Sequence, residues 1–189
     1  MKKNNTSFAI ILITSLFFLW GFALNLNPIL IPHLKKACQL TDLQSALIDS
    51  ASYIAYFIMA IPAGLFMKRF GYKGGIILGL SLFAVGAFLF YPAAETRTYA
   101  FFLGALFIIA CGLTFLETAA NPYITVLGDQ EGATRRINFA QSFNGLAATL
   151  APLIGGQFIL SGKVLTDAEL ASMQPAQLTA YLNNEASSV

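Results

Sequence analysis

A single acidic residue, Glu117, lies in one of the most apolar stretches of the chain, residues 101–128. An ionised carboxylate at the centre of a bilayer costs at least about 2.5–3.5 kcal/mol, so such residues usually face a bundle interior or a water-filled cavity. Acids in that position often belong to proton pathways, which makes Glu117 a candidate proton-coupling residue. The alternative is a structural carboxylate that bonds a neighbouring helix.

Other polar residues share a face with Glu117 if this stretch is a helix. Pro122 removes one backbone hydrogen bond beside them and frees a carbonyl group. A polar face next to a freed carbonyl indicates a polar cavity, and Asn121 therefore joins Glu117 as a candidate binding residue. At a period of 3.6 residues the face consists of Thr114, Glu117, Thr118, Asn121 and Thr125.

A second polar stripe lies on the expected helix 137–160 and consists mainly of amides. Asn138, Gln141 and Asn144 are spaced by three residues and cover about a third of the helix circumference. Amides offer donors and acceptors without charge, which suits the hydroxyl groups of a neutral polar ligand. They also form hydrogen bonds between membrane helices. Gln141 and Asn144 are therefore candidate ligand-binding residues, and the alternative is that they hold neighbouring helices together.

Further polar candidates lie toward the opposite end of the first two expected helices. Asn25 and Asn27 point about 200° apart on a helix, so we expect one to line a cavity and the other to pack. Asp49 lies near the start of the second helix, where it is either a coupling acid or a favourable charge at a helix N-terminus. Trp20 lies in mid-span, where it stacks on a ligand or packs in the core.

Composition predicts the elements that hold these side chains. The 189 residues are 57% hydrophobic and 11% charged, with a mean hydropathy of +0.68, whereas soluble domains carry about 25% charged residues. A basic N-terminus precedes an apolar run longer than that of a signal peptide and without a cleavage site, so we expect a retained first helix. Five segments reach the length of about 20 apolar residues that spans a bilayer: residues 8–31, 45–67, 74–94, 99–127 and 137–160.

The basic residues predict the orientation. With a cytoplasmic N-terminus, seven of the eleven lysines and arginines lie on the cytoplasmic side. Five spans then place the polar segment 161–189 outside, where it leads toward a sixth helix. The sequence has no nucleophile–base pair, metal-ligand spacing or phosphate-binding loop, and its net charge is only +2. We therefore expect no enzyme, cofactor, metal site or nucleic-acid partner.

Several segments resemble the fucose/galactose/glucose:proton symporter family, the L-fucose permease type, of the Major Facilitator Superfamily. The resemblance covers about residues 15–160 and is most specific in two blocks, LETAANP and AQSFN. It implies an all-α membrane protein of twelve helices in two domains, with the sugar bound between them and this chain supplying five. It also implies roles in proton coupling and sugar binding for Glu117, and sugar contacts for Asn25, Gln141 and Asn144. The segments are FFLWGFALNLNPILIPHL, PAGLFMKRFGYKGGI, YPAAE, GLTFLETAANPYITVLG and NFAQSFNGL.

The chain departs from the family pattern at two positions. Pro28 stands where the fucose permease has an aspartate that is a proposed protonation site, and Lys68 stands where the superfamily usually has an aspartate. We expect Asp49, at similar depth on the next helix, to take over from the missing acid. The resemblance implies uptake of a neutral sugar (fucose, glucose or galactose type) across the bacterial inner membrane by proton symport with alternating access. A truncated fragment without transport activity is the alternative.

Overall fold

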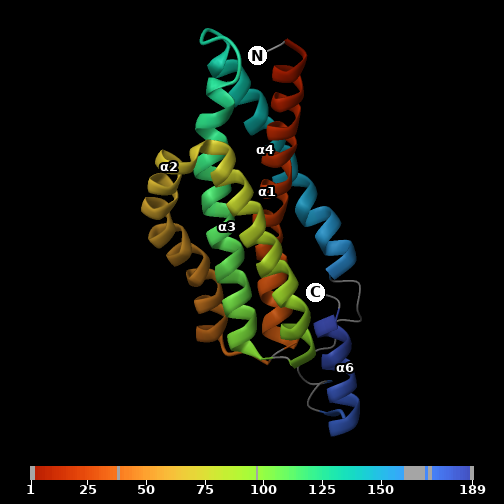
Figure 1. The fold of residues 1–189 in the computed structure, drawn as a ribbon. Coiled ribbons are helices and arrows are strands. Elements are labelled where there is room, and N and C mark those ends of the chain that lie inside the picture. Colours follow the sequence, from red (N-terminus) through yellow and green to blue (C-terminus); the bar gives the residue numbers. More distant parts are fainter. Residues whose placement is uncertain (1–2, 38, 97, 160–168, 170–171, 188–189) are drawn as a thin grey trace.

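The computed structural model describes residues 3–37, 39–96, 98–159, 169 and 172–187, and these residues fold into helices that run side by side (Figure 1). The N-terminus of α1 and the turn between α3 and α4 lie at one end of the bundle, and α6 lies beyond the other (Figure 1). The predicted helical stretch TDAELASM falls largely outside the described residues. The helices are α1 (Lys3–Ala37), α2 (Asp42–Thr96), α3 (Tyr99–Val126), α4 (Ala133–Ile159) and α6 (Pro175–Ser187).

Helix α2 contains two of the five predicted spans. It is interrupted at Gly71, whose φ of 72° and ψ of 172° are not helical, and glycine adopts positive φ without the steric cost that a side chain imposes. We call residues 42–70 the first arm and residues 72–96 the second arm. The predicted loop over residues 68–73 is therefore a break at one residue. With α1, α3 and α4, the two arms give the five predicted helices.

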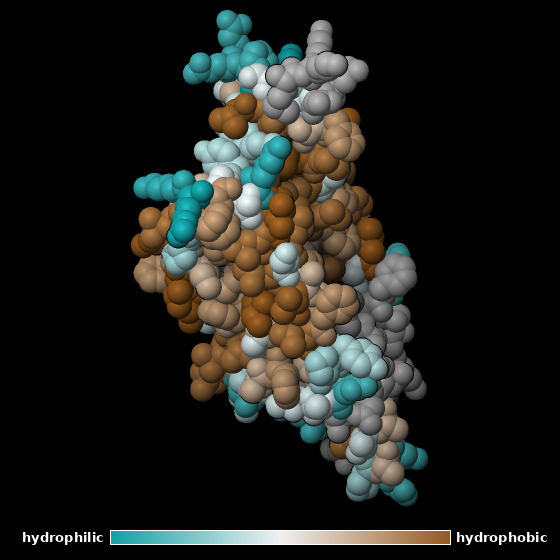
Figure 2. All heavy atoms as spheres, in the orientation of Figure 1, coloured by the Kyte–Doolittle hydropathy of each residue, from teal (hydrophilic) through white to brown (hydrophobic). Residues whose placement is uncertain are grey.

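Three helices in the described part of the chain are long and apolar enough to cross a membrane. They are Thr6–Pro32, Asp42–Ala93 and Tyr99–Val126, and the second has 52 residues, more than twice the length of about 20 that one crossing needs. Helix α4 does not reach the same hydropathy because amides and basic residues interrupt its apolar sequence. On the face shown in Figure 2, hydrophobic residues cover the middle of the bundle and hydrophilic residues gather mainly toward its ends.

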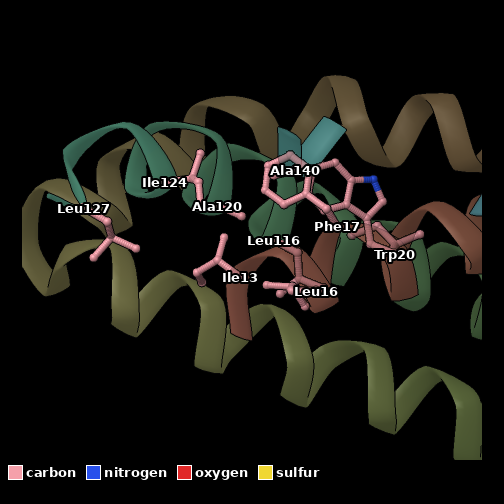
Figure 3. Close-up of a cluster of buried hydrophobic side chains, with 10 residues drawn as sticks. Ile13, Leu16, Phe17, Trp20, Leu116, Ala120, Ile124, Leu127 and Ala140 are labelled. Carbon is pink, nitrogen blue, oxygen red and sulfur yellow. The ribbon is translucent and has the colours of Figure 1, made fainter. Parts of the chain in front are cut away.

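The largest buried cluster joins α1 to α3 (Figure 3). Phe17 has no exposed surface, and its ring centroid lies 4.6 Å from that of Trp20, which is 4% exposed. Trp20 therefore packs in the core, the second of the two roles expected for it. The cluster consists of Ile13, Leu16, Phe17, Trp20, Leu113, Leu116, Ala120, Ile124, Leu127 and Ala140.

Arg136 fixes the turn between α3 and α4. Its guanidinium donates to the Ile124 carbonyl at 3.2 Å, the Thr125 carbonyl at 2.9 Å and the Asp129 carbonyl at 2.7 Å. It also pairs with the Asp129 carboxylate at 3.1 Å. Backbone N–H groups, including that of Gly132, and the Arg136 charge hold the pKa of Asp129 below its usual value. These bonds satisfy carbonyl groups that the end of α3 leaves unpaired.

The second arm of α2 packs on α3 through glycines. A Cβ atom on Gly112 would lie 2.7 Å from both the Gly79 carbonyl oxygen and the Phe83 backbone nitrogen. A Cβ atom on Gly86 would lie 2.8 Å from the Ile109 nitrogen. Only residues without side chains allow two membrane helices to approach this closely. The depth and rotation of α3 therefore depend on these glycines.

We predict that Gly112→Ala destabilises the chain by about 1–3 kcal/mol, because the new methyl group meets backbone atoms that cannot yield without a shift of the helices. Unfolding of the purified chain in detergent, followed by circular dichroism, measures the change. Gly104→Ala on the same helix is the matched control, since nothing lies within 4 Å of its added Cβ. Equal unfolding midpoints for the two variants would contradict the prediction.

Candidate functional site

An open cavity of about 780 Å³ lies between the outer half of α1 and the first arm of α2. Both Asn25 and Asn27 line it, so the expectation that only one of them would do so is wrong. The residues of α1 that line the cavity lie on one broad face of that helix. The other lining residues are Leu24, Pro28, Ile31, Pro32, Asp42, Ser45, Ala46, Ser52, Tyr53 and Tyr56.

The cavity wall combines apolar and polar side chains and is nearly uncharged in the described part of the chain. Asp42 is the acid among the lining residues, and it forms an ion pair with Lys35 at the end of α1. Pro28, which stands where the resemblance implied an acid, lies on this wall. Asp49 belongs to the first arm, but its side chain is outside the described residues. Its predicted coupling role stays a prediction.

Glu117 lies about two thirds of the way along α3 and is half-buried. Its carboxyl group faces the hydroxyl group of Tyr56, which comes from the first arm of α2. That hydroxyl oxygen is buried and makes no hydrogen bond of normal geometry with any described residue. Tyr56 lines the cavity and Glu117 does not. The tyrosine thus stands between the carboxyl group and the cavity.

One weak signal for Tyr56 is present in the sequence. Tyr53 and Tyr56 are spaced by three residues in an otherwise apolar helix, and both line the cavity. Tyrosine is also used in membrane helices for packing alone. The residue type and the spacing therefore did not show that Tyr56 has a functional role. The rotation that brings Tyr56 to Glu117 depends on how the first arm packs against α3.

The threonines of the predicted polar face form hydrogen bonds within their own helix. Thr114 donates to the Ala110 carbonyl, Thr118 to the Thr114 carbonyl and Thr125 to the Pro122 carbonyl, at 2.7–2.8 Å. Short hydroxyl side chains satisfy themselves in this way inside helices. Thr114 is only 2% exposed. The threonines do not line the cavity. Of the described residues on this face, Glu117 and Asn121 are the ones whose side chains meet polar groups of other helices.

The predicted amides join helices in two separate contacts. Gln141 donates to the Asn121 side chain at 3.1 Å and so links α4 to α3 on an exposed surface. Asn144 donates to the Phe17 carbonyl at 3.2 Å and so links α4 to α1. The backbones approach closely there, because a Cβ atom on Gly21 would lie 2.7 Å from the Asn144 amide nitrogen. One N–H of Asn144 thus forms a hydrogen bond between helices, which was the alternative to ligand binding.

The predicted residues therefore fall into neighbouring groups. Asn25 lies on the cavity between α1 and α2, Glu117 lies behind Tyr56, and Asn121 pairs with Gln141 between α3 and α4. Apart from Glu117, the predicted residues in these groups are amides. Amides can both donate hydrogen bonds to a polar uncharged ligand and accept them from it. Within the described residues no three histidine, cysteine or acidic side chains come together as metal ligands would.

Comparison with known proteins decides the family. The family model described as Major Facilitator Superfamily matches residues 10–164. The chain belongs to the Major Facilitator Superfamily.

Relatives within the superfamily carry sugars, to judge by their names. The chain is 49% identical over 181 residues to a glucose/galactose transporter of Brucella abortus, covering 96% of the chain and 43% of the transporter. It is 52% identical over 171 residues to the L-fucose-proton symporter of Escherichia coli K12, covering 90% of the chain and 39% of the symporter. The chain thus spans less than half the length of these relatives.

Solved structures of this superfamily agree with the fold. A crystal structure of a variant of the E. coli fucose:proton symporter superposes with a TM-score of 0.85 at 48% identity, covering 97% of the chain and 44% of the symporter. A second, of a transporter in the outward conformation, superposes with a TM-score of 0.84 at 50% identity. These matches confirm the predicted family, the all-α fold with five helices of a longer bundle, and a multi-pass protein of the bacterial inner membrane.

We predict that Asn144→Ala lowers the free energy of unfolding by about 0.5–1.5 kcal/mol, because the variant removes the part-buried hydrogen bond that joins α4 to the Phe17 carbonyl of α1. Denaturant unfolding of the chain in detergent measures this loss. Gln141→Ala is the comparison variant, since its bond to Asn121 is exposed and water can replace it. A larger loss for Gln141→Ala than for Asn144→Ala would contradict the assignment.

Proposed function

We propose that this chain is the N-terminal part of a secondary transporter that moves a neutral sugar of the fucose, glucose or galactose type together with a proton. The observation that carries the proposal is the half-buried carboxyl group of Glu117, held inside an apolar bundle without a described basic partner. An acid in that position supports a proton site. The names of the relatives, glucose/galactose transporter and L-fucose-proton symporter, support the sugar and the proton.

The side chains available to a sugar are neutral donors and acceptors. Asn25, Asn27, Ser45, Ser52 and Tyr53 line the cavity between α1 and α2. Sugar hydroxyls both donate and accept hydrogen bonds, and amides and hydroxyls match them in both senses. Gln141 and Asn144 remain proposed sugar contacts from α4, since each uses its amide N–H in an interhelical bond and keeps a carbonyl oxygen able to accept.

Coupling follows from the charge of Glu117. Proton binding removes a buried negative charge and so changes the relative stability of conformations that bury the carboxyl group to different extents. In transporters built from two helical domains, that difference biases which side of the membrane the central site faces. The proton would thereby favour the conformation that also binds sugar, and the two would cross together.

The second domain of such a transporter lies outside this chain. The relatives are more than twice as long as the stretch that the chain matches, and a sugar site at the interface of two domains needs both. The partners of this chain are therefore the lipid bilayer, the sugar, the proton and the C-terminal half of the transporter. Transport experiments require the protein extended to the length of its relatives.

In that extended protein we predict that Glu117→Gln abolishes sugar accumulation driven by an imposed proton gradient. Sugar exchange between the two sides at equal proton concentration is retained, because glutamine has nearly the same shape and mimics the protonated, neutral carboxyl group. Uptake of labelled fucose, glucose and galactose into vesicles measures both activities, with Asn138→Ala on the exposed side of α4 as control. Gradient-driven accumulation by Glu117→Gln would show that Glu117 is not the coupling acid.

We further predict that Asp49→Asn weakens gradient-driven accumulation, because Pro28 supplies no acid on α1 and Asp49 is expected at a similar depth on the next helix. The matched control is Asp42→Asn, which removes an exposed carboxylate already paired with Lys35. Accumulation in the same vesicles, compared with sugar exchange, measures the effect. Accumulation by Asp49→Asn equal to that of the parent would leave Glu117 as the sole coupling acid.

A further inference from the structure

The buried hydroxyl group of Tyr56 faces Glu117, the proposed coupling acid, and makes no hydrogen bond of normal geometry. Among the described residues, the buried side-chain polar atoms without a hydrogen bond are the hydroxyl oxygens of Thr14 and Tyr56. Inside a membrane bundle an unpaired hydroxyl is costly, because no bulk water can replace the missing bond. Polar groups kept at this cost commonly belong to functional sites. Of the two, Tyr56 is the one that faces a carboxyl group.

The ring of Tyr56 is fixed by its surroundings. It packs against the central cluster of α1 and α3, and also against a second cluster of Ala55, Ala110 and Cys111. The same side chain lines the cavity between α1 and α2. The ring is therefore held between the helices and the cavity, with its hydroxyl group toward Glu117.

Glu117 is the charged group that acts on Tyr56, and the neutral Tyr56 hydroxyl is the side-chain group that acts on Glu117. Within the described residues, no group from α1 or α4 contributes a charge to either side chain. Asp42 lines the same cavity, but it pairs with Lys35. Cys111 on α3 packs beside the Tyr56 ring as a buried thiol. The phenol and the carboxyl group therefore form an isolated pair in an apolar setting.

We propose that Tyr56 is the positioning residue for Glu117: its hydroxyl donates a hydrogen bond to the ionised carboxylate and holds it away from the sugar cavity. When Glu117 binds a proton, the carboxylate charge is gone and the hydrogen bond weakens. Tyr56 keeps its own proton throughout, and the proton exchanged during transport is that of Glu117. This inference rests on the proposed function and adds a residue to its coupling site.

A consequence for transport follows directly. The bond stabilises the ionised form of Glu117, which is the form that must appear when the proton is released inside the cell. Without the hydroxyl, Glu117 stays protonated through more of the cycle. Gradient-driven accumulation then falls, whereas sugar exchange at equal proton concentration continues because that exchange needs no proton release.

The test is Tyr56→Phe in the extended transporter, which removes the hydroxyl group and keeps the packed ring. We expect accumulation to fall by about tenfold, the change that corresponds to loss of one hydrogen bond to a charged group, with exchange equal to that of the parent. The control is Tyr91→Phe, which removes a hydroxyl from an exposed tyrosine of α2 that does not line the cavity. It is expected to accumulate sugar as the parent does.

A double variant separates positioning from a general packing role. In a Glu117→Gln background, Tyr56→Phe is expected to leave sugar exchange unchanged, because the carboxylate on which the hydroxyl acts is already absent. Three results would overturn the inference: accumulation by Tyr56→Phe equal to that of the parent, loss of exchange together with accumulation, or a further loss of exchange in the double variant. If the parent itself shows no gradient-driven accumulation of any of the three sugars, the proposed function fails first, and that result is distinct from these three.

Discussion

The close approach of the second arm of α2 to α3 is the contact on which the rest of the bundle depends. Three glycines, Gly79, Gly86 and Gly112, bring backbone against backbone at positions where a methyl group would meet main-chain atoms below 3 Å. Lipid tails are as apolar as leucine, so membrane helices associate through such close packing and through hydrogen bonds more than through the hydrophobic effect. This contact sets the depth and rotation of α3, and with them the direction in which Glu117 points.

Once α3 is placed, most buried polar side chains among the described residues have a partner. The threonines of α3 bond to their own helix, Asn144 satisfies a carbonyl of α1, and Arg136 satisfies the last carbonyls of α3. A bilayer interior offers no water to groups left unpaired, so this degree of satisfaction is required for stability. The exceptions among the described residues are the hydroxyl oxygens of Thr14 and Tyr56, and that of Tyr56 faces the Glu117 carboxyl group. An acid and a phenol that are kept together without a basic partner are consistent with a site whose charge changes during function.

The arrangement also separates the proposed sugar contacts from the proposed proton site. The cavity wall contributed by α1 and the first arm is neutral apart from Asp42, while Glu117 lies behind the ring of Tyr56. Proton binding and sugar binding can then influence each other through one side chain without direct competition for the same atoms. The replacement of an α1 acid by Pro28 makes this single link more important in this chain, because the described cavity wall offers no unpaired acid of its own.

The sequence by itself determined the membrane class, the number and approximate limits of the helices, the family, and Glu117 as the exceptional acid. Each of these depends on properties that are local along the chain: the length of apolar runs, the spacing of polar residues and the cost of a charge in lipid. Only the tertiary structure decided that residues 68–73 form a break at Gly71, that both Asn25 and Asn27 line the cavity, that Trp20 packs in the core and that Tyr56 faces Glu117. Those features depend on the rotation and depth of one helix against another. Backbone contacts between glycines far apart in the sequence set both quantities, and a single helical periodicity carries no information about them.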